Sequence, residues 1–172
     1  MNAANALPGL DHAALAGLKV VEFAHVIAGP LAGTLLADLG ADVVHVDDPS
    51  TGDPGRKMGP PKDGVYLWWK VSARNKRSVT IDLRKPEGQD LARQLVAWAD
   101  VVIVNFRADT LKKWGLDWDA IHAENPTAIV LHVSGFGLAS SKANLPGFGK
   151  VGEARSGVVY VTGFPDGPPV HT

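Results

Sequence analysis

The region from Leu18 to Val46 carries the pattern that most restricts how this chain can fold. Two short apolar runs with paired β-branched residues, Leu18 to Ala24 and Ala41 to Val46, lie on either side of a stretch whose leucines recur at helical spacing. Pro30 suits the first position of that helix, and Gly40 suits its end. A strand, a helix and a strand within about 30 residues predict a βαβ unit with parallel strands and a right-handed crossover.

The rest of the chain continues this alternation. Alternating apolar and polar residues predict a strand over Ser78 to Leu83, and apolar runs predict strands over Val101 to Val104 and Ala128 to Val133. Helical patterns cover Pro86 to Trp98, Thr110 to Trp114, Trp118 to Glu124 and Val151 to Tyr160. Between Asp47 and Gly64, prolines, glycines and charges dominate without a period, which predicts a long surface loop. The expected fold is an α/β domain, doubly wound around a mainly parallel, Rossmann-like sheet.

Length and composition fit one globular domain. The chain has 172 residues, of which 45% are hydrophobic and 20% are charged. We expect residues 1–17 to form a frayed leader and residues 18–172 to form the α/β domain. The chain ends in a segment rich in proline and glycine, from Thr162 to Pro169, without a closing strand or helix. This ending predicts a fragment whose domain is incomplete at its C-terminal end.

Net charge and residue types argue against several classes of function. A formal net charge of -1 gives no overall field that would attract nucleic acid or an anionic membrane, so we expect neither as a partner. Without cysteine there are no disulfides or thiolate metal sites, and the six histidines lack the spacing of metal ligands, so we expect no metal. Residues 1–11 lack the features of a signal peptide, and no apolar run approaches the roughly 20 residues that span a bilayer. We therefore expect a cytoplasmic protein.

Basic residues are concentrated in one stretch, where Asp63 is the single acidic residue. Seven of the chain's 17 lysines and arginines lie there: Arg56, Lys57, Lys62, Lys70, Arg74, Lys76 and Arg77. Such a cluster could hold several phosphates through charge-assisted hydrogen bonds, although charge alone favours a solvated surface. Trp68 and Trp69 beside it could stack on adenine, although tryptophans more often serve core packing.

Two predicted strands end in turns that suit a binding site. The turn from Ala24 to Pro30 follows the first strand at the edge where open α/β sheets bind ligands. It lacks the Gly-x-Gly-x-x-Gly pattern of dinucleotide sites, and the chain has no Gly-Lys-Ser/Thr phosphate loop. Asn105-Phe106-Arg107 follows the strand from Val101 at the equivalent edge. Although His25 alone could be structural, two strand ends that face one crevice predict a site.

Together these segments resemble the family III CoA-transferases (CaiB/BaiF family), which include formyl-CoA and carnitine-CoA transferases and, more distantly, α-methylacyl-CoA racemases. The order and spacing of the matching segments carry the resemblance, which covers nearly the whole chain. The segments are LKVVEFAHVIAGP (18–30), LLADLGADVVHV (35–46), RNKRSVTIDL (74–83), Pro86-Glu87-Gly88, DVVIVNFR (100–107) and the stretch from Val161 to Pro169.

The resemblance implies a site for a coenzyme A thioester as substrate, with no prosthetic group. Residues at the matching positions would contact CoA: His25, Val26 and Ala28 at the thioester end, and Ile81, Arg84, Asn105, Phe106 and Lys113 around the adenine and phosphates. Arg84 and Lys113 have the charge to bind phosphate. Arg84 lies near a helix start, where the helix dipole disfavours a cation, and this is mild support for another role.

The family's reaction uses an aspartate that attacks the donor thioester and then carries CoA as an aspartyl thioester. The resemblance places this nucleophile just beyond Thr172, so we expect no catalytic residue within the chain. Asp166, between a proline and a glycine, is typical of an ordinary turn, and Glu153 of a surface carboxylate. The resemblance also implies a homodimer for the full-length protein.

Two positions bear on the branch of the family. Ile27 occupies the place where oxalate-using members carry a glutamine, so a polar contact to a small dicarboxylate is lost. Phe148 occupies the place of the histidine that moves the α-proton in racemases, and a phenyl ring cannot transfer a proton. We therefore expect transfer of CoA between an acyl-CoA and a free carboxylic acid. The alternatives are a CoA-thioester racemase or isomerase and a non-catalytic CoA-binding partner subunit.

Overall fold

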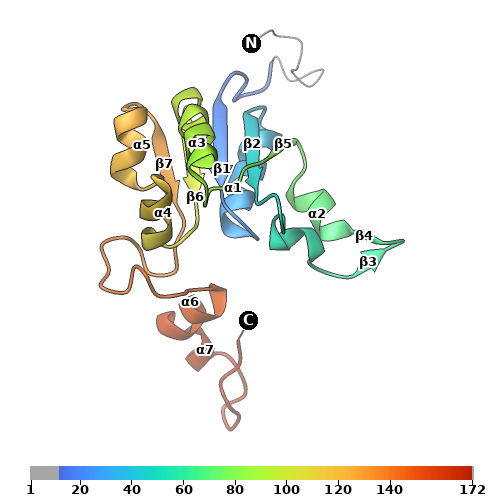
Figure 1. The fold of residues 1–172 in the computed structure, drawn as a ribbon. Coiled ribbons are helices and arrows are strands. Elements are labelled where there is room, and N and C mark those ends of the chain that lie inside the picture. The colour runs from blue at the N-terminus through green and yellow to red at the C-terminus, as the bar shows by residue number, and fades with distance from the viewer. Residues whose placement is uncertain (1–11, 172) are drawn as a thin grey trace. The chain divides into compact units, whose positions relative to one another are not determined.

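The computed structural model describes residues 12–171, and the part of the expected leader that covers residues 1–11 lies outside them (Figure 1). The chain divides into two compact units. The first comprises the chain up to Phe106 together with Thr110–Val133, and the second comprises Arg107–Asp109 and the chain from Ser134 onward. In the first unit, the backbone N–H of Leu15 donates to the carbonyl of Leu39 at 2.9 Å.

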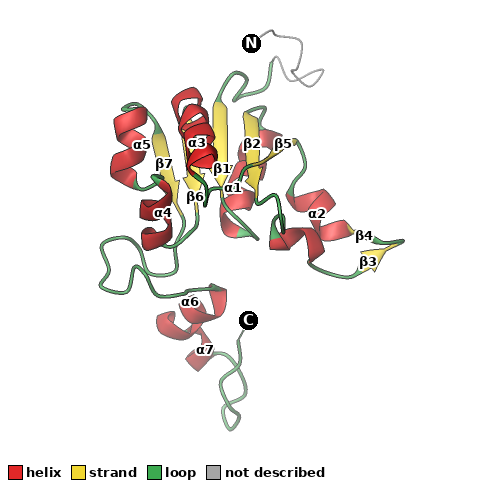
Figure 2. Cartoon of the chain, viewed as in Figure 1, coloured by secondary structure: helices red, strands yellow, loops and turns green. Residues whose placement is uncertain are grey.

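A parallel sheet of five strands, in the order β5-β2-β1-β6-β7, forms the centre of the first unit (Figure 2). The strands are β1 (Lys19–Phe23), β2 (Asp42–Asp47), β5 (Lys76–Thr80), β6 (Val101–Val104) and β7 (Ile129–His132). The doubly wound α/β fold expected from the sequence is confirmed. The chain builds β1, β2 and β5 outward in one direction and then returns to add β6 and β7 on the other side of β1. The order therefore reverses between β1 and β6, where folds of this class bind their ligands.

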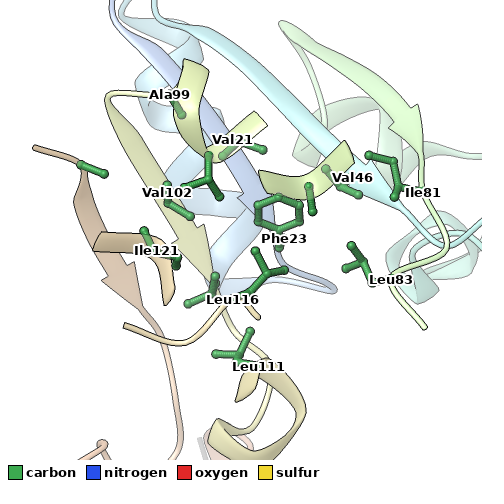
Figure 3. Close-up of a cluster of buried hydrophobic side chains, with 14 residues drawn as sticks. Val21, Phe23, Val46, Ile81, Leu83, Ala99, Val102, Leu111, Leu116 and Ile121 are labelled. Atoms are coloured by element: carbon green, nitrogen blue, oxygen red, sulfur yellow. The ribbon is translucent and has the colours of Figure 1, made fainter. Parts of the chain in front are cut away.

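Helices cover both faces of the sheet (Figure 1). One face packs against α1 (Ala28–Asp38), and the other packs against α3 (Pro86–Trp98), α4 (Ala108–Trp114) and α5 (Trp118–Glu124). Side chains alternate along β1, so Val20 joins the core under α1 while Val21 and Phe23 join the opposite core. Figure 3 shows Phe23 within that second core, near Val102 and Leu116. Burial on both faces explains why the central strands β1, β2 and β6 are rich in apolar residues.

The predicted loop between β2 and β5 contains short elements that the sequence analysis did not anticipate. They are the 3-10 turn η2 (Pro54–Lys57), the hairpin strands β3 (Pro61–Lys62) and β4 (Val65–Tyr66), and the helix α2 (Leu67–Ser72). The hairpin turns at Asp63 and Gly64, whose φ angles of 50° and 78° are both left-handed. An Asp-Gly pair between two strands favours such a turn, so the signal was present in the sequence.

The second unit carries α6 (Gly149–Ser156) and α7 (Val158–Val161). The single helix predicted from Val151 to Tyr160 is therefore wrong. Gly157 lies between the two helices with a left-handed φ of 86°, a conformation that ends a helix and that glycine adopts without strain. Asp166 lies in a turn, as expected, which is closed by a 3.0 Å hydrogen bond from the N–H of Gly167 to the carbonyl of Phe164.

Small residues bring α1 close to the sheet. The helix begins at Ala28, so Pro30 is its third residue instead of its first, and Leu31 and Leu35 are about half exposed. The buried face includes Gly33, where an added Cβ would lie 1.9 Å from a carboxylate oxygen of Glu22. The leucine spacing correctly indicated a helix, but glycine and other small residues determine which face meets the strands.

The face under α1 contains a buried network of charged side chains. Alternation places Glu22 of β1, His45 and Asp47 of β2, and Lys76 of β5 on this face. His45 Nδ1 lies 2.5 Å from Glu22 and its Nε2 lies 3.3 Å from Asp47. Lys76 Nζ donates to both oxygens of Glu22, at 2.7 and 3.0 Å. Asp47 is also paired with Arg56, so each charge of the network has an opposite charge beside it.

The network keeps His45 protonated. Burial by itself would lower the pKa of His45, but hydrogen bonds to Asp47 and Glu22 outweigh burial and raise the pKa to about 9. For Asp47, hydrogen bonds from His45, Arg56 and Ser78 outweigh burial and hold the pKa well below its ordinary range. Burial lowers the pKa of Lys76, and the charge of Glu22 opposes that shift.

We predict that Gly33→Ala destabilises the fold by roughly 2 kcal/mol or more, because its methyl group would collide with the buried Glu22 carboxylate. Urea unfolding would measure the change. Gly152→Ala is the matched control, since Gly152 also lies within a helix but an added Cβ meets no atom within 4 Å. Equal stability of the two variants would contradict the close packing of α1 on Glu22.

We predict that the free energy of unfolding decreases between pH 6.5 and pH 9. The pKa of His45 is raised from 6.5 to about 9 on folding, so its stabilisation is complete below pH 6.5 and is lost as the pH rises through 9. The size is on the order of 3 kcal/mol. His45→Gln should remove this slope, whereas His12→Gln, at an exposed position, should keep it. A wild-type profile that is flat over this range would contradict the prediction.

Candidate functional site

A pocket opens at the carboxyl ends of the strands in the first unit. Its walls come from the ends of β1, β2 and β6, from the segment after β5, and from α4. The lining residues are His25, Val46, Asp47, Asp48, Ile81, Leu83, Arg84, Phe106 and Trp114. The pocket therefore lies beside the point where the strand order reverses, and both strand-end turns predicted to face one crevice contribute to it.

The turn after β1 has an unusual backbone. Val26 has a φ of 71°, in the left-handed region that β-branched residues rarely adopt and that costs about 1–3 kcal/mol. Two side chains hold the turn in place. Asn105 accepts a hydrogen bond from the N–H of His25 at 2.9 Å and donates one to its carbonyl at 2.7 Å. Asp53 accepts from the N–H of Val26 at 3.0 and 3.1 Å, so the strained turn is fixed from both sides.

Three rings form one wall of the pocket. Phe106 packs edge to face against His25, with ring centroids 4.7 Å apart, and against Trp114 at 4.9 Å. Burial lowers the pKa of His25 below its ordinary value, against the opposing influence of Asp53. His25 is therefore neutral at pH 7 and presents an uncharged imidazole. This wall suits a flat or apolar group better than an anion.

Arg84 and Asp48 line the polar side of the pocket, and Asp82 pairs with Arg84 from outside the lining. The guanidinium lies 3.1 Å from Asp48 and 2.7 Å from Asp82. Hydrogen bonds from Ser50, together with Arg84, lower the pKa of Asp48, and the hydrogen bond to Asp82 raises the pKa of Arg84. All three side chains are therefore charged at neutral pH. An anionic ligand would share Arg84 with these carboxylates or displace them.

The residues suggested by the resemblance fall into three groups. His25, Ile81, Arg84 and Phe106 line the pocket together. Asn105 lies behind it and holds the backbone of His25. Val26, Ala28 and Lys113 do not line it: Val26 and Ala28 lie in the turn and at the start of α1, and Lys113 is exposed on α4 directly before Trp114.

The basic stretch serves mainly structural ion pairs. Four of its cations pair with carboxylates from other segments: Arg56 with Asp47, Arg74 with Asp38, Lys76 with Glu22 and Arg77 with Asp42. Four of the seven basic side chains are thus already balanced, which leaves fewer of them for phosphates, the alternative to a solvated surface. Trp69 packs against the guanidinium of Arg56, 4.3 Å from its ring centroid, and against His45, so its ring already has protein partners.

Several residues of the site escaped the sequence analysis. Asp48, Leu83 and Trp114 line the pocket, and Asp53 holds the turn.

A glycine pattern at residues 147–152 matches the spacing of a dinucleotide loop, but it follows a loop instead of a strand, because β7 ends at His132. Charged residues at alternate positions of apolar strands, such as Glu22 and His45, were the available signal for the buried network.

Within residues 12–171, no helix has the length and apolar character needed to cross a membrane. Over the same residues, no group of three or more histidine, aspartate or glutamate side chains is arranged to hold a metal ion.

Known proteins support the likeness that the sequence segments suggested. Residues 15–172 match the family described as CoA-transferase family III. A succinyl-CoA–D-citramalate CoA-transferase from Chloroflexus aurantiacus is 50% identical over 153 residues, which are 88% of this chain and 38% of that protein. A succinate–glutarate CoA-transferase from Agrobacterium fabrum is 44% identical over 163 residues, 91% of this chain and 41% of that protein.

A solved structure agrees in fold as well as in sequence. The crystal structure of a CAIB/BAIF family protein from Brucella suis superposes with a TM-score of 0.85 and 42% sequence identity, covering 93% of this chain and 43% of that one. The chain thus spans about two fifths of the length of the relatives it matches. The match runs through the sheet, the pocket and the second unit, and the chain belongs to CoA-transferase family III.

Proposed function

We propose that the whole protein is a CoA-transferase that moves CoA between an acyl-CoA and a free carboxylic acid, and that residues 18–172 form its CoA-binding α/β domain, incomplete by itself. The observation that carries this proposal is the pocket at the reversal of strand order, which joins a neutral histidine, an aromatic wall and an arginine. A CoA thioester offers matching chemistry, with an apolar pantetheine arm, a flat adenine and phosphates.

The apolar and backbone contacts to CoA come from the pocket and from the turn beside it. His25, Val26 and Ala28 border the thioester end, where the turn presents backbone and imidazole groups. Phe106 and Ile81 provide apolar contacts to the nucleotide or pantetheine. These assignments follow the family resemblance and agree with the neutral charge of His25 and the edge-to-face packing of Phe106.

The polar residues divide between ligand contacts and support. Arg84 binds phosphate and gives up its ion pair with Asp48 in doing so. Lys113, exposed on the adjacent helix α4, contributes a second positive charge. Asn105 supports the turn through its two hydrogen bonds to the backbone of His25.

The chemistry requires a carboxylate nucleophile, which we expect just beyond Thr172. Its oxygen attacks the carbonyl of the acyl-CoA and the C–S bond breaks. CoA leaves as a thiolate, and the aspartate and the acyl group form a mixed anhydride. The thiolate then attacks the aspartyl carbonyl and releases the donor carboxylate, which leaves an aspartyl-CoA thioester. The acceptor acid takes CoA through the same steps in reverse. Neither a metal nor a redox cofactor takes part in this sequence.

The substrates we favour are dicarboxylic acids of four or five carbons. The two transferases compared above are named for succinyl-CoA with D-citramalate and for succinate with glutarate. Ile27, which is partly exposed beside the pocket turn, lacks the polar contact expected for oxalate.

We further propose a homodimer in the cytoplasm. Phe148 weighs against the racemase alternative, because it cannot carry the α-proton.

Incubation of the whole protein with succinyl-CoA and a panel of carboxylic acids tests the proposal. We expect new CoA thioesters, detected by mass spectrometry, and an enzyme-bound ester that hydroxylamine converts to a hydroxamate. Exchange of deuterium at the α-carbon without transfer would favour a racemase. Tight CoA binding with neither transfer nor exchange would favour the non-catalytic partner subunit.

We predict that Arg84→Gln weakens CoA binding about five- to tenfold, because a charge-assisted hydrogen bond to phosphate is lost. Calorimetric titration with CoA and with pantetheine, which lacks the nucleotide, would measure the change. The effect should disappear for pantetheine. Arg93→Gln is the matched control, since Arg93 also pairs with an aspartate on the protein surface but does not line the pocket. Equal affinity of both variants for CoA would contradict the role of Arg84.

A further inference from the structure

The left-handed conformation of Val26 is unfavourable for this residue type, so an interaction elsewhere in the protein must stabilise it. Of the three non-glycine residues with positive φ among residues 12–171, Val26 is the one with a β-branched side chain. The same peptide segment positions His25 against Phe106 in the pocket. Asn105 holds His25 on one side, but its hydrogen bonds end at His25. The conformation of the next residue depends on a different group.

Asp53 is that group. Its carboxylate is buried and accepts the N–H of Val26 with both oxygens and the N–H of Gly55 with one, at 2.6 Å. An added Cβ at Gly55 would lie 3.3 Å from the carbonyl of Val26, so the turn after Asp53 packs closely against the turn after β1. Asp53 thus contacts Val26 through its side chain, and Gly55 of the same loop lies against the Val26 carbonyl.

The buried network extends to Asp53 and balances its charge. His45 Nε2 lies 3.7 Å from the Asp53 carboxylate, and the backbone N–H of Asp53 donates to Asp47 at 2.8 Å. With Asp53 included, the network holds three carboxylates, on Glu22, Asp47 and Asp53, and three cations, on Lys76, Arg56 and His45. This chain of contacts connects β5, β2 and β1 to the pocket turn.

We infer that Asp53 is a positioning residue for the pocket: its buried carboxylate holds the turn at Val26 in the left-handed conformation and thereby sets His25 against Phe106, at the place where the CoA thioester binds. The last clause rests on the proposed function. The role of Asp53 in fixing the turn is independent of the proposed function, because it follows from the contacts of Asp53 alone.

An asparagine cannot replace this carboxylate fully. The carboxylate accepts hydrogen bonds from the N–H groups of Val26 and Gly55 and forms an ion pair with the protonated ring of His45. Oδ1 accepts the N–H groups of Val26 and Gly55, and Oδ2 accepts the N–H of Val26 and lies 3.7 Å from the His45 ring. An amide would place its NH2 group at one of these two positions, facing a donor in either case. Asp53→Asn therefore keeps the size of the side chain and removes the feature that selects the turn.

The experiment compares Asp53→Asn, Val26→Gly and the double variant in the whole protein. Crystal structures give the φ of residue 26, and calorimetric titration gives the Kd for CoA. We expect Asp53→Asn to move Val26 out of the left-handed region and to raise the Kd about tenfold, because the competent turn becomes a minor state. In the Val26→Gly background, the same substitution should raise the Kd less than about threefold, since glycine adopts positive φ freely.

Asp117→Asn is the matched control. Asp117 also accepts a backbone N–H, from Ala120 at 3.0 Å, at the start of a helix away from the pocket lining, and its substitution should leave the Kd unchanged. If Asp53→Asn fails to fold, the inference requires that the double variant folds, because glycine relieves the strained residue. Failure of both to fold would overturn the inference.

Two further results would overturn it: an unmoved Val26 in Asp53→Asn, or a moved Val26 with an unchanged Kd for CoA. Failure of the proposed function is recognised separately. In that case the unsubstituted protein does not bind CoA, while the crystal structures still decide whether Asp53 holds the turn.

Discussion

Three neighbouring strands of this sheet carry charged side chains on a face that is covered by a helix. Glu22 contacts both His45 and Lys76 beneath α1, and this pairing makes the burial of these charges possible. The helix needs a residue without a side chain where it passes over Glu22, and Gly33 occupies that position. The network therefore determines the packing of α1, whose first residue, Ala28, belongs to the pocket turn. Fold and site depend on the same set of contacts.

The reversal of strand order explains why the pocket lies where it does. Between β1 and β6 the chain leaves the sheet in opposite directions, so the turns after these strands diverge and leave space at their ends. Asn105 spans this gap by hydrogen-bonding both backbone groups of His25. The crevice is thus a consequence of topology, whereas its exact shape is a consequence of two side chains, Asn105 and Asp53.

Most of the fold could be predicted from the sequence, because apolar runs and helical spacing report burial directly. The strands β1, β2 and β6 and the helices α3 and α5 agree closely with their predicted ranges. The missed elements have other causes. None of the residues of α2 is buried, so no apolar period marks this helix. Gly157 ends α6, and the apolar residues Val158–Val161 after it form a separate helix.

The candidate site was predictable in part. Its backbone positions follow from the strand ends, so His25 and Phe106 could be found, and the resemblance added Ile81 and Arg84. Asp48 and Asp53 could not, because they lie in a loop without a period and their partners are distant in sequence. The same holds for the basic stretch, whose neutralising carboxylates come from β1, α1 and β2. Local counting of charges cannot detect such pairs. Where the chain departs from ordinary local preferences, with buried charges in strands and a valine at positive φ, Asp53 connects the departures, because it lies 3.7 Å from His45 and accepts the N–H of Val26. Such departures are expected where function, and not stability alone, shapes the local sequence.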